Sequence, residues 1–556
     1  MKNQSFLTSA TRLLPLFLLL VLPAAVQGQF TYQTNNGGIT ITRYTGSDGT
    51  VVIPSTTNGL PVTCIGDWAF EDASSMTNVT IPGSVTKIGA YVFSYCSGLT
   101  GVTIPGSVIY IGLAPFVACS ALAAITVETN NPAYVSLDGV LFNHGQTTLI
   151  QCPGSKAGGF TIPNSVTNIE ESAFNGCSAL TSVNIPDSVI RIANGAFRGC
   201  RSLTNVLIPS SVTAIDSAPF PACSSLAAIL VDTNNPAYAA LEGVLFDKNR
   251  TILIQYPGAR AGGYTIPNSV TDIGDLSFYS CLGLTSVTIP DSVTLIRSYA
   301  FSSCRGLTNV TMGNYVSDIG YHAFALCISL PSVTLPNTVT NIGQTAFQAC
   351  SSLTSVTIPA SVAKIGDGSF TSCSRLAAII VDTNNPAYLS LDGVMFSKDQ
   401  ATLIQYPGGR AGSYTVPNSV TNIGNGAFEA CVGLTGVYFQ GNAPGLGWDP
   451  FYGDGLATVY FLPGTTGWGP QFGELSTALW RPQIQTSDNR FGVRTNQFGF
   501  DIAWASGMTV VVEASANLAN HDWTPVQTNT LTGPSSYFSD PQWTNYSSRF
   551  YRLRWP

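Results

Sequence analysis

The chain has 556 residues, of which 45% are hydrophobic and only 10% are charged, and its formal net charge is −7. An acidic chain without a basic stripe is a poor binder of nucleic acid or of an anionic membrane surface. Because so few side chains are ionic, the surface should consist largely of Thr, Ser and Asn. A chain of this length suggests several domains, unless the sequence consists of repeats.

The first 28 residues have the pattern of a secretory signal peptide. Lys2 and Arg12 give it a positive start, an apolar run follows over residues 13–22, and Gly28 precedes the expected cleavage point. This run is too short to span a hydrocarbon layer of roughly 30 Å, and no later run approaches the length of a membrane-spanning helix. We therefore expect residues 1–28 to be removed and the mature chain to be exported without a transmembrane segment.

A period of 23 residues organises residues 51–480. Residues 97–119 read SGLTGVTIPGSVIYIGLAPFVAC, and residues 351–373 read SSLTSVTIPASVAKIGDGSFTSC. Phe recurs at steps of 23 residues, apart from three steps of 58, and a Cys follows it three positions later. The buried spine of the array is predicted to include Phe93, Phe116, Phe174, Phe197, Phe278, Phe301, Phe324, Phe347 and Phe370.

Each period predicts one coil of a solenoid. In the segment LTSVTI at residues 353–358, Val356 and Ile358 alternate with polar residues, as in a strand with one buried face. Pro359 then ends the strand because it cannot donate to a ladder of hydrogen bonds. One coil cannot bury its own apolar face, so the coils must stack in a long array.

Three coils are longer, at residues 127–162, 231–266 and 381–416, with 35 residues rather than 23 from strand to strand. Each contains TNNPAY, then GVLF or GVMF, and then a LIQ segment. The apolar runs on either side of NHGQ, DKNR or SKDQ are predicted to form a hairpin that projects from the coil.

The ends of the array need caps. Residues 29–50, with alternating Ile39 and Ile41, are predicted to form a hairpin over the first coil, and strands near residues 438–439 and 458–461 are predicted to close the other end. From residue 481 the period is lost. Alternating segments at 498–503, 509–514, 523–528 and 549–555 predict that residues 481–556 form a small antiparallel β-sandwich-like domain.

The repeat resembles the BspA-like leucine-rich-repeat family of bacterial surface antigens through the pattern LxxVxIPxSVxxIGxxAFxxC, which recurs over roughly residues 30–480. The resemblance implies a right-handed β-solenoid arc with a parallel sheet on its concave side, and roles in adhesion or protein binding. The chain departs from the pattern at residues 312–315, where the Ile-Pro pair is lost. The predicted fold class is mainly β, a leucine-rich-repeat solenoid followed by the small C-terminal domain.

No catalytic constellation is evident, so the chain is not expected to be an enzyme. Nucleophilic catalysis usually needs a base such as His beside the nucleophile. His144, His322 and His521 are the only histidines, and none recurs with a Ser or Cys partner. Each is interpreted as a surface residue, and no catalytic residue, metal site or cofactor is predicted.

Two other features, the cysteine column and the TNN segments, resemble disulfide or metal sites. Eleven cysteines follow the Phe column. Stacked strands lie ~4.8 Å apart, so the Cα atoms of cysteines in neighbouring coils would be close enough for a disulfide. We interpret them as a reduced core ladder, with Cys64 and Cys152, outside the column, as the exposed thiols. Glu128, Asp232 and Asp382 begin the TNN segments, and one carboxylate before Asn-Asn-Pro is more simply an Asx turn than a calcium site.

The polar strand positions predict hydroxyl rows on one face of the sheet. These rows are either a solvated surface or a wide, nearly uncharged face that binds a protein or a glycan. The leading hypothesis is a secreted or cell-surface adhesion protein that binds an extracellular protein, and the alternatives are a carbohydrate-binding accessory protein and a structural spacer of the envelope. The candidate binding face comprises Thr181, Thr204, Thr285, Thr288, Thr308, Thr311, Thr354 and Thr357.

Overall fold

The computed structural model describes residues 29–35, 37–487, 489–503, 509–519, 522–530 and 535–555. The predicted signal peptide, residues 1–28, and His521 lie outside the described residues. Over the described ranges the regular structure consists of β-strands and one 3-10 turn, Trp543–Asn545, and no helix there has the length and apolar character needed to cross a membrane. The chain divides into two compact units, one with residues 1–157 and 165–178 and the other with residues 158–164 and 179–556.

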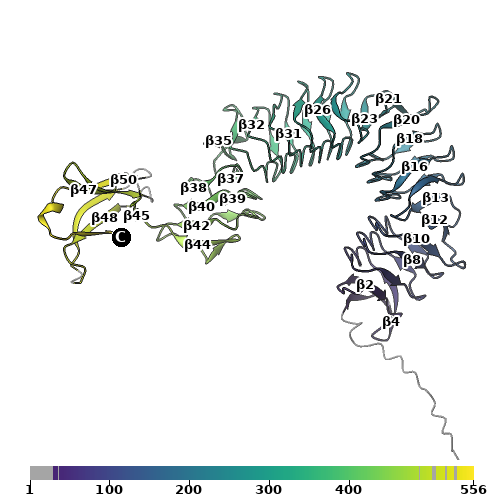
Figure 1. The fold of residues 1–556 in the computed structure, drawn as a ribbon, viewed down its shortest axis with the longest axis horizontal. Coiled ribbons are helices and arrows are strands. Elements are labelled where there is room, and N and C mark those ends of the chain that lie inside the picture. The colour runs from purple at the N-terminus through teal and green to yellow at the C-terminus, as the bar shows by residue number, and fades with distance from the viewer. Residues whose placement is uncertain are drawn as a thin grey trace, which may run out of the picture. The chain divides into compact units, whose positions relative to one another are not determined.

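Within each unit, successive coils stack through a first column of parallel strands (Figure 1). Val102 pairs with Ile125 and Val287 pairs with Val310, so the register advances by one period of 23 residues. The first unit contributes β3 (Thr50–Val52), β6 (Asn78–Thr80), β8 (Gly101–Ile104) and β10 (Ala124–Val127). The second unit contributes β14 (Gly158–Thr161), β16 (Leu180–Asn184), β18 (Asn205–Ile208), β20 (Ala228–Val231), β24 (Gly262–Thr265), β26 (Leu284–Thr288), β28 (Asn309–Thr311), β30 (Ser332–Val333), β32 (Ser355–Ile358) and β34 (Ala378–Val381).

A second column of short parallel strands runs beside the first. Within each run of this column, neighbouring two-residue strands place their Ile residues, or in the last coil a Leu, side by side, as with Ile296 and Ile319. The first unit contributes β5 (Leu60–Ile65), β7 (Lys87–Ile88), β9 (Tyr110–Ile111) and β15 (Asn168–Ile169). The second unit contributes β17 (Arg191–Ile192), β19 (Ala214–Ile215), β25 (Asp272–Ile273), β27 (Leu295–Ile296), β29 (Asp318–Ile319), β31 (Asn341–Ile342), β33 (Lys364–Ile365), β39 (Asn422–Ile423) and β41 (Gly445–Leu446).

The predicted alternation of faces is present in the strands. In β32, Val356 and Ile358 are buried while Ser355 and Thr357 are exposed. The chain is therefore a β-solenoid of stacked parallel coils, as the sequence predicts.

The Phe turn closes each coil. Tyr299 and Ser303 have φ values of 56° and 61°, on either side of Phe301. The backbone N–H groups of these three residues donate to the carbonyl oxygens of residues 321, 323 and 325 in the next coil, at 2.8, 2.7 and 2.8 Å. This third ladder holds Phe301 in the interior, where it is fully buried.

The three long coils fold as antiparallel meanders of three strands each. The prediction of a projecting hairpin is wrong for its strands, because Val244, Leu245 and Phe246 of the middle strand of the second coil are fully buried. Three consecutive inward-packed side chains fit because a bulge follows Leu245 in the pairing with the third strand. In the hairpin of β22 and β23, the exposed residues are those of the tip, residues 248–250. The meanders comprise β11 (Tyr134–Leu137), β12 (Val140–Asn143) and β13 (Thr148–Gln151); β21 (Tyr238–Leu241), β22 (Val244–Asp247) and β23 (Ile252–Gln255); and β35 (Tyr388–Leu391), β36 (Val394–Ser397) and β37 (Thr402–Gln405).

Antiparallel hairpins lie at both ends of the array. At the first end, β1 (Phe30–Asn35) pairs with β2 (Gly38–Tyr44), which pairs in parallel with β5, while β4 (Thr56–Thr57) pairs with β5. The last coils contain β38 (Gly412–Val416), β40 (Leu434–Phe439), β42 (Thr458–Phe461) and β44 (Leu475–Leu479), with β43 (Gln471–Phe472) antiparallel to β44.

The C-terminal segment forms two antiparallel sheets. One contains β45 (Gln483–Ile484), β46 (Gly492–Arg494), β47 (Gln497–Ala503) and β50 (Ser535–Asp540), and the other contains β48 (Thr509–Ser515), β49 (Thr524–Thr530) and β51 (Phe550–Arg554). Phe500 and Phe538 of the first sheet share a small buried core with Val510 and Val512 of the second. The segment is therefore sandwich-like, with β45 already part of it.

Candidate functional site

All eight threonines of the candidate binding face are exposed. They lie in or next to strands of the first column, on the side opposite the buried Val and Ile residues. Between β26 and β32 the strand positions that point outward contain Thr, Ser and Asn and no charged residue. The exposed rows thus form a polar, uncharged surface, which we call the threonine face.

The hydroxyls of this face fall into two groups. The Oγ1 atoms of Thr308 and Thr354 donate to the carbonyl oxygens of Thr285 and Pro331 in the preceding coil, at 2.9 and 3.3 Å. These side chains hold neighbouring coils together.

Thr288, Thr311 and Thr357 occupy the next outward position of their strands, and their hydroxyls bond to none of the described residues. This row can both donate hydrogen bonds to a ligand and accept them.

The same row becomes apolar at its edges. Leu207, Leu230 and Ile380 occupy the corresponding position in other coils, and about half of each side chain is exposed, at 51%, 51% and 49%. Register places Leu207 beside Leu230 and Thr357 beside Ile380. A ligand of the face would therefore meet hydroxyls in its middle and aliphatic side chains at its flanks.

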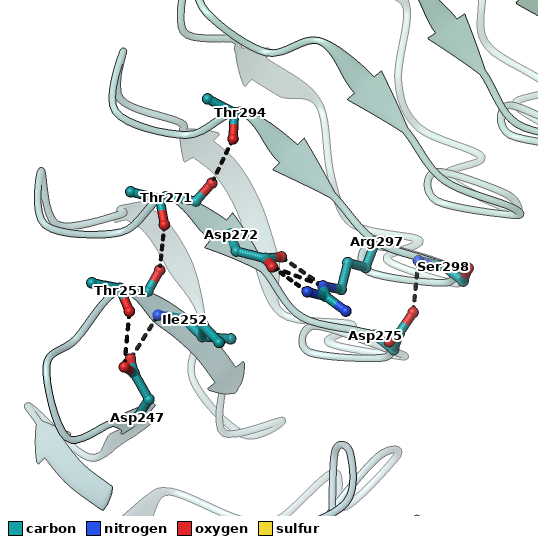
Figure 2. Close-up of polar contacts among 9 residues, drawn as sticks. All are labelled: Asp247, Thr251, Ile252, Thr271, Asp272, Asp275, Thr294, Arg297 and Ser298. Atoms are coloured by element: carbon teal, nitrogen blue, oxygen red, sulfur yellow. Dashed lines mark hydrogen bonds and ion pairs between the residues drawn. The ribbon is translucent and has the colours of Figure 1, made fainter.

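A second hydroxyl ladder lies beside the short strands. Thr251, Thr271 and Thr294 follow one another in consecutive coils (Figure 2), and each of the last two donates to the carbonyl oxygen of the one before it, at 3.3 Å. The hydroxyl of Thr251 donates to the Oδ2 atom of Asp247 at 2.8 Å. This ladder is internal to the fold, so the threonine preference at these positions needs no ligand to explain it.

The nine phenylalanines of the predicted spine are all buried, with at most 1% of each exposed. The rings of Phe301, Phe324 and Phe347 stack at centroid distances of 5.0 and 5.3 Å. Their role is in the core and not on a surface.

None of the thirteen cysteines, all of which lie in the described ranges, is in a disulfide, and twelve of them are buried. Cys64 is partly exposed, but the prediction of an exposed thiol at Cys152 is wrong, since only 1% of that residue is exposed. Cys152 occupies the position that Tyr256 and Tyr406 occupy in the other two long coils, and both of these side chains are also buried. The residue after the LIQ segment therefore points into the core.

The histidines that the structure describes do not face a nucleophile. His144 is exposed at the tip of the first long coil. His322 stacks on the ring of Tyr299 at 4.9 Å, and its burial lowers the pKa of its imidazole.

The TNN segments hold their coil to the preceding coil through buried hydrogen bonds. Asn235 is fully buried, its Nδ2 atom donates to the carbonyl oxygens of Pro209 and Val212 at 2.7 and 3.0 Å, and its Oδ1 atom accepts from the N–H groups of Ala237 and Tyr238. Asn131 and Asn385 make the same bonds in the other two long coils. Within the described ranges, no three His, Cys, Asp or Glu side chains gather closely enough to hold a metal ion.

The structure also contains pockets that the sequence analysis did not predict, and one of them combines ionic and aliphatic walls. It lies beside the second long coil and has a volume of about 340 Å³. Its walls combine aliphatic and ionic side chains from four consecutive coils, and they include Ile215, Asp216, Tyr238, Asp247, Ile252, Ile254, Asp275 and Arg297. A pocket of this size and mixed lining is at the small end of the range of ligand sites.

Two ion pairs fix the charged walls of this pocket. Asp216 pairs with Arg191, and Asp272 accepts hydrogen bonds of 2.8 Å at both carboxylate oxygens from the Nε atom of Arg297 (Figure 2). The hydrogen bonds to Asp272, which is 7% exposed, raise the pKa of Arg297 above its ordinary value. The guanidinium is therefore held in place over the pocket.

The signal that could have revealed this pocket is a break in the glycine column of the repeat. Most coils have Gly directly after the Ile of the second strand, because a Cβ there would meet the previous coil; at Gly343 it would lie 2.5 Å from the backbone of Gly320. Asp216 and Arg297 stand at this position in their coils. Charged residues at a position that otherwise favours Gly mark a local change of packing.

Comparisons with known proteins agree with this architecture. A family model for the BspA type leucine rich repeat region matches in six copies, over residues 49–143, 151–240, 262–387 and 410–470. No curated protein matches.

Among solved structures, a leucine rich cell surface protein from Faecalibacterium prausnitzii A2-165 is 32% identical, over 64% of this chain and 93% of that one, with a TM-score of 0.43. A leucine-rich repeat protein from Bacteroides ovatus ATCC 8483 is 25% identical, over 63% of this chain and 92% of that one, with a TM-score of 0.27. The pneumococcal vaccine antigen PcpA is 19% identical, over 79% of this chain and 93% of that one, with a TM-score of 0.35. With its family model matched over most of residues 49–470, the chain belongs to the BspA-type leucine-rich-repeat family.

Proposed function

We propose that the chain works outside the cell or on its surface as an interaction protein, and that its threonine face binds a protein ligand. The observation that carries the proposal is the row of free hydroxyls at Thr288, Thr311 and Thr357, which is exposed, uncharged and flanked by aliphatic side chains. Such a surface suits a partner recognised by shape and hydrogen bonds. The family to which the chain belongs supports the same kind of role.

The rigidity of the face also supports binding. Its strands pair in parallel with the neighbouring coils, as β26 does with β28, and their apolar side chains lie in the continuous buried core. A surface held in this way loses little conformational entropy when a partner binds, so less of the interaction energy is lost to ordering.

The test uses the secreted full chain and a triple variant, Thr288→Lys, Thr311→Lys and Thr357→Lys. The probe is an array of extracellular proteins, with a glycan array beside it. We expect a protein ligand whose binding falls at least tenfold in the variant, because three long charged side chains would stand where hydroxyls met the ligand. The matched control is Thr129→Lys, Thr233→Lys and Thr383→Lys, three exposed threonines of the TNN segments that add the same charge.

Equal loss of binding in both triple variants would mean that the added charge, and not the face, is responsible. Binding to glycans alone would favour the carbohydrate-binding alternative, and binding to neither array would favour the structural spacer.

A further inference from the structure

The pocket beside the second long coil arises from a gap in the column of short strands. β19 ends one run of this column, and the next run continues from β23 to β25. At the gap the backbone N–H of Ile215 donates to the hydroxyl of Tyr238 at 2.6 Å instead of to a strand. The third long coil has the same break, where Ile365 donates to Tyr388 at 2.9 Å, so the fold produces an equivalent pocket there.

The two pockets differ in size and in chemistry. The pocket of the third long coil has a volume of about 160 Å³, against about 340 Å³ for the second. The second pocket is lined by Asp216, Asp247, Asp275 and Arg297. The equivalent sequence positions around the third long coil are Gly366, Ser397, Asn425 and Gly447, of which Gly366 and Asn425 line the smaller pocket.

The polar groups of the third pocket bind one another. The Nδ2 atom of Asn425 donates to Asp367 at 2.8 Å, and its Oδ1 atom accepts from the N–H of Trp448 at 2.6 Å. Both polar atoms of the Asn425 side chain are therefore bonded within the fold.

The second pocket has a donor and an acceptor without partners. The Oδ1 atom of Asp275 accepts from the N–H of Ser298 at 2.9 Å, while its Oδ2 atom accepts from none of the described residues (Figure 2). Arg297 donates to Asp272 through Nε and Nη2, and its Nη1 atom donates to no described residue. Asp275 and Arg297 line the same pocket.

A hydroxyl group is complementary to such a pair, because it donates one hydrogen bond and accepts others. Hydrogen bonds to charged groups are stronger than those between neutral groups. The aliphatic wall at Ile252 and Ile254 gives a second, apolar contact. A ligand with adjacent hydroxyls and a C–H face satisfies both walls, which is the chemistry of a sugar ring.

We propose that this pocket binds one saccharide unit of an extracellular glycan, with Asp275 and Arg297 on its hydroxyls and Ile252 and Ile254 on its C–H face. The pocket is separate from the threonine face, and the saccharide proposal does not depend on the protein-binding function proposed for that face.

The experiment is saturation-transfer NMR on the purified full chain, with glucose, galactose, mannose and N-acetylglucosamine as probes. Asp275→Asn keeps the acceptor for Ser298 and removes the free carboxylate, and Ile252→Thr removes the apolar wall. Both introduce the residue that the third long coil has at that position, Asn425 and Thr402, so both are expected to fold. Asp382→Asn is the matched control, since this exposed carboxylate likewise accepts from a backbone N–H, that of Asn384.

We expect at least one sugar to give a signal with the parent chain, a tenfold or greater loss of affinity in Asp275→Asn and in Ile252→Thr, and no change in Asp382→Asn. The threonine-face triple variant should also keep the sugar signal, which separates this site from the protein-binding one. The proposal is overturned if none of the four sugars binds the parent chain, or if affinity is the same in Asp275→Asn and Ile252→Thr as in the parent.

Discussion

The thiol of Cys304 donates a hydrogen bond of 3.0 Å to the backbone carbonyl oxygen of Phe278 in the preceding coil. Cys327, Cys350 and Cys373 repeat this contact at 3.2 Å, each to the Phe of the coil before it. The ladder uses the S–H group, so it needs reduced sulfur. Burial raises the pKa of Cys304 to about 12, which suppresses the reactive thiolate.

Thiol labelling of the native protein should therefore modify Cys64 alone, and slowly, because partial burial also raises the pKa of its thiol. After denaturation all thirteen cysteines should react. Labelling counted by mass spectrometry provides the measurement, with the denatured sample as its control. Detection of a disulfide between Cys281 and Cys304 would contradict the thiol ladder.

Removing a ring from the Phe stack should destabilise the array strongly. Phe301→Ala or Phe347→Ala deletes a fully buried side chain, and such cavities cost about 3–5 kcal/mol. Thermal and denaturant unfolding of the full chain measure the loss. Tyr315→Ala, at a residue that is 62% exposed, should melt like the parent, and an unchanged melt for the Phe variants would disprove the core role of the stack.

A buried aspartate in the last coil should make the folding stability depend on pH. Asp454 lies 23 residues after Cys431, at the cysteine position of its coil, with 2% of its surface exposed and no hydrogen-bond partner for either carboxylate oxygen. Burial, with repulsion from Glu429 and Glu474, raises the pKa of Asp454 to about 7. In the unfolded chain an aspartate titrates near pH ~4.

Because this pKa is higher in the folded state, the folded chain holds a proton that the unfolded chain has released between about pH 4 and pH 7. The contribution of Asp454 to stability should fall as pH rises through this window and then level off. Asp454→Asn should remove this part of the pH dependence and raise the Tm at pH 8. A Tm difference between variant and parent that stays the same from pH 4 to pH 8 would show that Asp454 is not buried as an acid.

The C-terminal domain should be separable from the solenoid by proteolysis. Pro, Gln, Ser, Asp and Asn cluster between Trp480 and Phe491, which predicts an exposed cleavable segment there, and the part of it that forms β45 pairs with β47 inside the domain. Ser487, Asn489 and Arg490 are exposed between β45 and β46, and we expect proteolysis beside them. A chain ending at Trp480 should keep a cooperative melt, and its collapse would mean that the segment acts as a cap of the solenoid.

Binding by the threonine face should depend little on salt. The face between β26 and β32 has no charged side chain to pair with an anionic or cationic ligand, and screening weakens only interactions between charges. We expect the affinity for the protein ligand to change less than about threefold between low and physiological ionic strength. A steep fall would place the binding site on a charged part of the chain.

The sequence by itself determined the coil, because the information is local and repeated. The alternation in LTSVTI at residues 353–358 selects one buried strand face, Pro359 ends the strand, and the 23-residue step places equivalent residues side by side. The buried Phe spine and the exposed threonines follow from the same pattern.

Only the tertiary structure decided which polar groups form hydrogen bonds within the fold and which remain available to a ligand. Thr308 and Thr311 have the same side chain three residues apart, but only the hydroxyl of Thr308 reaches a carbonyl oxygen of the preceding coil. Asp275 and Arg297 line one pocket because the column of short strands parts at the second long coil. Hydrogen bonds depend on where the neighbouring coil places its donors and acceptors, within tenths of an ångström, and no local pattern of residues specifies that distance.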